Sequence, residues 1–220
     1  MNTHAVANRA PQSTLTDWLH ALISAVPLFC LAYVLFQVWI DPLAWDNGRW
    51  VPYGVGLLVL EFLVLHSSAF ISAYSAKTLS PTENIKIFAG LFVFYLLTAV
   101  GIALSTQSLD LLWVIAAIMV SRFIQAWRAT RQAQKNAQAR SAFGICLYLA
   151  VVAGTVFIDL PAMGITQEVL NTTYPSRGGG IWEQHPQRAI VGGGVYFAVL
   201  GVAELTFLRA KTTTETAISF

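Results

Sequence analysis

Long apolar runs separated by short polar segments set the pattern of this chain. A membrane-spanning helix needs about 20 mainly apolar residues, and six stretches meet or approach that length. The pattern predicts an all-α, polytopic membrane protein, with a six-helix transmembrane bundle over residues 17–208 between polar tails at 1–16 and 209–220. The predicted spans are residues 17–40, 53–75, 84–105, 109–127, 141–158 and 188–208.

The positive charges between these spans predict the orientation. Lys and Arg in short loops are retained on the cytoplasmic side of a membrane. The first, third and fifth loops hold few of them, whereas the second and fourth loops and both tails hold most. These basic residues are Arg9, Lys77, Lys86, Arg128, Arg131, Lys135, Arg140, Arg209 and Lys211. Both termini are therefore predicted to be cytoplasmic, in a plasma membrane or a bacterial inner membrane.

The fourth loop, RATRQAQKNAQAR, consists largely of strong helix formers. Arg128, Arg131 and Lys135 are three and four residues apart, which places them on one helix face. We expect this segment to extend the fourth span into the cytoplasm as a basic helix. Such a helix either anchors the topology beside anionic lipid or docks a partner.

Composition supports the membrane assignment. Of the 220 residues, 56% are hydrophobic and 11% are charged, against about 25% charged in a soluble domain. The net charge of +2 is too small to indicate a nucleic-acid partner. The lipid bilayer is the predicted environment, and a homo-oligomer or a larger membrane complex is an open alternative for further partners.

The second predicted span carries a stripe of small and polar residues. Gly54, Glu61, Ser68, Ser72 and Ser75 fall within about 60° of one another at 100° per residue. Such a stripe is expected to face another helix or an aqueous path. Glu61 is then either a protonated acid that is hydrogen-bonded across helices or a proton or cation site, because desolvation favours the protonated form of a carboxyl group.

His66 belongs to a different face of the same helix. It lies five residues after Glu61 and so about 140° around the helix, which excludes a paired ligand motif like HExxH. The histidine is either satisfied by a single partner or is a haem or metal ligand whose second ligand comes from another helix. The sequence assigns no cofactor and no metal.

Three ionisable groups are predicted to share a layer near the cytoplasmic side. Counted from the outer ends of their spans, His66 and Arg122 lie at about 20 Å and Glu204 at about 24 Å. An ion pair between Arg122 and Glu204 would relieve the desolvation cost of both, with His66 nearby. Glu204 also shares a face with Gly193 and Gly201, which is typical of helix packing. The pair either locks two helices together or takes part in function. Alternatively, Arg122 extends its charged group to the cytoplasmic interface, since it is five residues from Trp127.

The loop over residues 160–187 is the longest outside the spans, and is a folded cap, a re-entrant segment or a flexible loop. Glu183 and His185 in this loop, together with Asp159 at its start, are the external candidates for metal binding or acid–base chemistry. Asp46 and Glu168 are further carboxylates on the same predicted side. No P-loop, GxSxG or dinucleotide motif is present, which lowers the expectation of an enzyme.

Three functions fit these features. The first is an ion or proton channel or transporter that uses Glu61 and the layer of His66, Arg122 and Glu204. The second is an accessory or assembly subunit of a larger membrane complex, in which the same groups hold helices together. A redox or metal-dependent enzyme subunit is third, because no catalytic motif supports it.

Overall fold

The computed structural model describes residues 15–75, 81–106, 131–175 and 178–217. Within these ranges the chain is helical and has no strands, as the sequence predicts. The α-helices are α1 (Leu15–Ile40), α2 (Trp50–Ser75), α3 (Pro81–Thr106), α5 (Arg131–Phe157), α6 (Gln167–Thr173), α7 (Ile181–Gln184) and α8 (Pro186–Ala217), and the 3-10 turns are η1 (Pro42–Ala44) and η2 (Asp46–Gly48).

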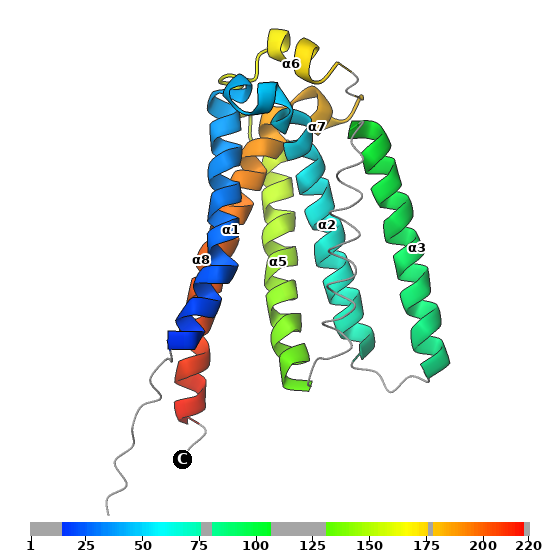
Figure 1. Cartoon of the computed structure of the whole chain (residues 1–220), viewed down its shortest axis with the longest axis vertical. Helices are drawn as coiled ribbons and strands as arrows, with labels where there is room; N and C mark the ends of the chain where they lie inside the picture. Colours follow the sequence, from blue (N-terminus) through cyan, green and yellow to red (C-terminus); the bar gives the residue numbers. More distant parts are fainter. Residues whose placement is uncertain (1–14, 76–80, 107–130, 176–177, 218–220) are drawn as a thin grey trace, which may run out of the picture.

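The five long helices run side by side, and the short elements gather at one end of the bundle (Figure 1). We call this end, where η1, η2, α6 and α7 lie, the capped end. Among the described residues, three helical segments are long and apolar enough to cross a membrane: Leu22–Ile40, Ala139–Phe157 and Pro186–Thr206. Trp50–His66 and Ala89–Thr98 are shorter apolar segments. Length and composition therefore support a membrane location, whereas the predicted span over residues 109–127 lies outside the described residues.

Glycines on α8 allow α1 to pack closely against it, and this is the most extensive helix contact of the described structure. Gly193 lies against Leu35 of α1, and a Cβ added to Gly201 would lie 2.9 Å from the ring of Phe29. Small residues at a helix interface permit such an approach of two backbones. The glycine-bearing face predicted for the last span is thus confirmed as a packing face.

The basic segment of the fourth loop is helical over residues 131–140, as predicted, and its predicted junction with the fourth span lies outside the described residues. Residues 131–140 form the first turns of α5 and continue into the apolar residues of the following span. The first glycine of α5 is Gly144, and the helix contains no proline, so nothing in its sequence ends the helix before the apolar part begins. Residues 128–130 lie outside the described part.

The long loop between α5 and α8 is a folded cap. Ile165, Leu170 and Tyr174 are buried in it and join the main hydrophobic core. The indole nitrogen of Trp39, near the end of α1, donates a hydrogen bond of 2.8 Å to the carbonyl oxygen of Pro161. The burial of these apolar residues therefore supports a folded cap over a re-entrant segment or a flexible loop.

Candidate intramembrane polar site

Polar side chains from two helices meet α2 near the middle of the bundle. The hydroxyl of Tyr196, a fully buried residue of α8, donates a hydrogen bond of 2.8 Å to Oε1 of Glu61. The hydroxyl of Tyr148 on α5 donates one of 3.1 Å to the carbonyl oxygen of Leu58 on α2. We call Glu61, Tyr148 and Tyr196 the Glu61 site.

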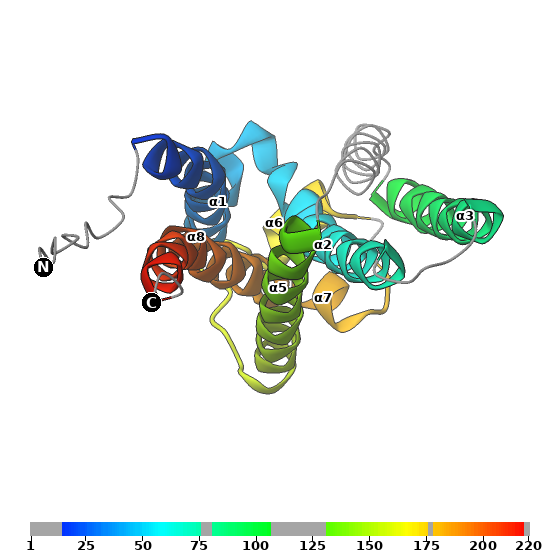
Figure 2. The same ribbon diagram turned by 90° about the horizontal axis from the view of Figure 1, so that it is seen from below.

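The two tyrosine rings fix the geometry of the Glu61 site. Their centroids lie 5.9 Å apart at an interplanar angle of 88°, which is the edge-to-face arrangement that aromatic quadrupoles favour. Viewed along the helices, α5 lies beside both α2 and α8 (Figure 2). Three helices therefore hold the site together.

The Glu61 site lies deep within the bundle. Counted from the capped ends of their helices at 1.5 Å per residue, Glu61, Tyr148 and Tyr196 all lie roughly 14–17 Å in. A bilayer has a hydrocarbon core of about 30 Å. If the capped end is at one membrane surface, these hydroxyls and this carboxyl group share a layer near the midplane.

The stripe predicted on α2 faces α8. A Cβ added to Gly54 would lie 2.9 Å from Cγ1 of Ile190, and Glu61 binds Tyr196 on the same partner helix. The prediction that the stripe contacts another helix is confirmed for these two residues. The side chains of Ser68 and Ser72 lie outside those that the structure describes.

His66 points away from the contact of Glu61 with α8, as its helical position predicts. Its Nδ1 lies 2.9 Å from the carbonyl oxygen of Phe62, one turn earlier on α2, and an N–H at this position donates to that oxygen. The rings of His66 and Phe62 have centroids 3.8 Å apart, and the Phe62 ring lies 5.7 Å from that of Tyr148. His66 therefore adjoins the Glu61 site through an aromatic contact.

Glu204 has a charged partner that the sequence analysis did not predict. Nη1 of Arg140 on α5 lies 3.1 Å from Oε2 of Glu204, and the two side chains are 47% and 23% exposed. Both lie roughly 26 Å from the capped end at 1.5 Å per residue. Arg122 lies outside the described residues, so its pairing with Glu204 stays a prediction.

The sequence analysis places Arg140 in the fourth loop, just before the predicted fifth span, and therefore does not include it among the polar groups of the membrane. The signal was available in the sequence, since Arg140 is only three residues before Phe143 and no helix breaker separates the two. Continuing the fifth span backwards as a helix brings Arg140 to the depth of Glu204.

Asp159, the first external candidate, has a structural role. Nη2 of Arg188 lies 2.8 Å from Oδ1 of Asp159, and Nη1 of the same arginine donates to the carbonyl oxygens of Thr155 and Val156 at 3.5 and 3.2 Å. These carbonyls belong to the last turn of α5, and the carbonyl groups in the last turn of a helix have no N–H partner within the helix. Arg188 thus joins the start of α8 to the end of α5.

The other external candidates do not join Asp159 in a metal site. Oε2 of Glu183 accepts a hydrogen bond of 3.1 Å from the backbone nitrogen of Gly180 and so caps α7, while His185 is exposed. Within the described parts of the chain, no group of three or more His, Cys, Asp or Glu residues could hold a metal ion. Asp159 and Glu183 therefore serve separate local contacts.

No protein-family model, no curated protein and no solved structure matches this chain. The proposals below consequently rest on its own residues and their contacts.

Proposed function

We propose that this chain is an integral membrane protein of six spans in which Glu61 exchanges a proton as part of a proton or cation pathway. The hydrogen bond between Tyr196 and Glu61 carries the proposal. If the capped end is at one membrane surface, this ionisable group would lie near the midplane, and ionisable groups at that depth are costly and commonly mark proton or ion pathways.

The chemistry of a tyrosine partner suits exchange. A carboxylate only accepts hydrogen bonds, whereas a carboxylic acid both donates and accepts, and a phenol hydroxyl does both as well. Tyr196 can donate to the carboxylate or accept from the acid, so the contact between α2 and α8 persists through both protonation states of Glu61. The Glu61 side chain is also only partly buried.

The course of the described helices supports six spans. α3 ends at the capped end and α5 begins at the opposite end, as a fourth span between them would require (Figure 1). Lys86 and Arg140 lie toward the uncapped end of their helices. We propose that this end is cytoplasmic together with both termini, because basic residues are retained there.

Proton flux into liposomes tests the proposal. The purified chain is expected to dissipate an imposed pH gradient, and Glu61→Gln is expected to remove this flux because the amide cannot exchange the proton. The matched control is Glu168→Gln, since Glu168 is an exposed carboxylate on α6. Equal flux in Glu61→Gln and in the wild-type chain would rule out the role of Glu61, and absence of flux from the wild-type chain would rule out the pathway.

The surface of α3 favours a second candidate, an accessory subunit of a larger membrane complex. In the described structure α3 packs mainly on α2 at the edge of the bundle. Its outward side chains are large and apolar, and include Phe92, Phe94, Leu97 and Leu104. Such a surface faces lipid or another subunit, either a second copy or a different chain.

Purification in a mild detergent separates the two candidates. An accessory subunit is expected to copurify with other membrane proteins in fixed proportion at native expression. A chain that elutes alone under these conditions would contradict the accessory role, whatever the outcome of the flux assay.

A further inference from the structure

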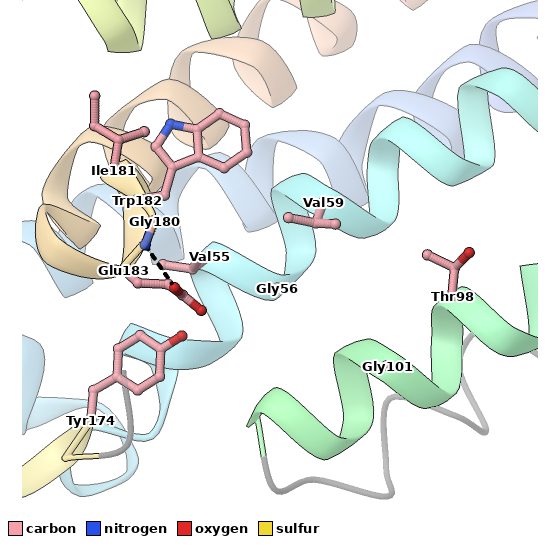
Figure 3. Close-up of a pocket in the computed structure, with 10 residues that line it drawn as sticks. All are labelled: Val55, Gly56, Val59, Thr98, Gly101, Tyr174, Gly180, Ile181, Trp182 and Glu183. Atoms are coloured by element: carbon pink, nitrogen blue, oxygen red, sulfur yellow. Dashed lines mark hydrogen bonds between the residues drawn. The ribbon is translucent and has the colours of Figure 1, made fainter. Parts of the chain in front are cut away.

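A pocket of about 520 Å³ lies between α2, α3 and the residues around α7, at the capped end (Figure 3). Val55 and Val59 of α2 and Gly101 of α3 line its walls, and Tyr174 and Glu183 come from the cap. Ligand pockets in proteins typically measure about 300–1,000 Å³. The pocket is therefore large enough for a small organic molecule.

The charge among the described residues that line this pocket is negative. Among the described residues that line it, Glu183 is the charged one, and none is basic. Figure 3 shows the carboxylate of Glu183 and the hydroxyl of Tyr174 on the same side of the pocket, beside α2. Burial, and secondarily the charge of Glu183, raise the pKa of Tyr174, so its phenol stays neutral beside a carboxylate.

The acidic wall is held in place by contacts of its own. The backbone nitrogen of Gly180 binds Oε2 of Glu183, and the indole nitrogen of the adjacent Trp182 donates a hydrogen bond of 3.0 Å to Oγ1 of Thr155 on α5. These bonds fix the position of the carboxylate relative to the bundle. Such preorganisation reduces the entropy that binding costs.

The opposite wall is apolar and open. The hydroxyl of Thr98 on α3 donates to the carbonyl oxygen of Phe94 at 2.9 Å, which satisfies it within its own helix. Among the described residues, a Cβ added to Gly101 would meet no neighbouring atom within 4 Å. The described parts of α2 and α3 therefore leave space for an apolar body between them.

We propose that this pocket binds a small amphiphilic organic cation. Its ammonium group sits on the carboxylate of Glu183, and its apolar body lies against Val55 and Val59. This site is separate from the Glu61 site, and the proposal does not depend on proton exchange. A free amine and the ammonium headgroup of a lipid share the required chemistry.

Calorimetric titration with 2-phenylethylammonium tests the proposal. The full chain is placed in nanodiscs of phosphatidylglycerol, which has no amine, and the heat from empty nanodiscs is subtracted. Saturable binding is expected. Repeating the titration at a fixed fraction of phosphatidylglycerol, with the remainder either phosphatidylethanolamine or an uncharged glycolipid, keeps the surface charge equal and assigns the source. Weaker apparent binding of the probe with phosphatidylethanolamine indicates competition by lipid, and equal binding indicates a free amine.

Two variants locate the site. Glu183→Gln keeps an oxygen that can cap α7 but removes the charge, and we expect binding about tenfold weaker or more, because a charge-assisted contact is lost. Gly101→Leu fills the open wall and is also expected to abolish most of the binding. The control Glu168→Gln changes a carboxylate elsewhere on the cap and is expected to bind the probe as the wild-type chain does.

Three results would overturn the proposal. They are the absence of saturable binding by the wild-type chain, unchanged affinity in Glu183→Gln, and equal affinity for the neutral analogue 2-phenylethanol. The last result would mean that the pocket recognises an apolar body without its charge.

Discussion

Removing the hydroxyl of Tyr196 tests whether the bond to Glu61 stabilises the bundle. In Tyr196→Phe the ring stays in its fully buried position, and only the donor to Oε1 of Glu61 is lost. The second perturbation is Glu61→Met, which has a similar length and no polar group. The two variants and their combination form a double-mutant cycle, which isolates the interaction between the two side chains.

The magnitude follows from the geometry. The bond is 2.8 Å long and its donor is fully buried. Interhelical hydrogen bonds in a membrane average about 0.6 kcal/mol and reach about 1.7 kcal/mol, while bonds to charged groups contribute about 1.5–3 kcal/mol in proteins generally. We therefore expect a coupling energy of about 0.5–2 kcal/mol. Values near the upper limit are expected if Glu61 is ionised, and values near the lower limit if it is protonated.

Reversible unfolding in mixed detergent micelles measures this coupling. The free energy of unfolding is determined for the four chains of the cycle and for a control cycle that combines Glu61→Met with Tyr33→Phe. Tyr33 is exposed on α1, so the control effects should add to within about 0.5 kcal/mol. A coupling between Glu61 and Tyr196 no larger than that of the control would refute the reasoning.

Three further outcomes are expected, each measured by unfolding in mixed micelles. Gly192→Leu should lower the free energy of unfolding by about 1–3 kcal/mol, because the new side chain would clash with Thr155 on α5. Gly90→Leu should be nearly neutral, because no atom of the described residues lies within 4 Å of a Cβ added there. Equal effects of the two substitutions would contradict the close packing of α8 on α5. Arg140→Gln should cost about 0.5–1 kcal/mol by removing the partner of Glu204, since the Arg140 side chain is half-exposed, and adding Glu204→Gln should recover part of the loss; a further loss would argue against the pair. Burial and a neighbouring carboxylate raise the pKa of Tyr174 in the folded state. The contribution of the neutral phenol to the free energy of unfolding is therefore complete below the unfolded pKa of about 10, and it is lost as the pH rises through the folded pKa. Tyr174→Phe should flatten that alkaline decline, and an unchanged decline would exclude this cause.

Local periodicity predicted much of this structure. The helical class, the positions of the described long helices and the separation of Glu61 from His66 follow from apolar length and from 3.6 residues per turn. These properties depend on neighbours along the chain, which the sequence displays directly. The packing face of Gly193 and Gly201 was predictable for the same reason.

The partners of the polar groups were not predictable in this way. Tyr196 lies in an apolar span and carries no charge that would single it out, and its bond to Glu61 depends on how α8 is rotated against α2. Arg140 was assigned to a loop because its neighbours before it are polar, although the helix continues through it. The packing of α8 against α2 sets the first pairing, and no local pattern encodes it. The run from Arg140 to Phe143, which contains no helix breaker, was a local signal for the depth of Arg140, although not for its partner.

The most direct test of the account is the protonation of Glu61 itself. Infrared difference spectra of the reconstituted chain, recorded as the pH is stepped across the neutral range, resolve the carbonyl stretch of a protonated carboxyl group. The account predicts a band that appears and disappears reversibly with pH, that is absent in Glu61→Gln and that shifts in Tyr196→Phe. A band from Glu61 that stays constant throughout the range, or no band that depends on Glu61, would contradict proton exchange at this site.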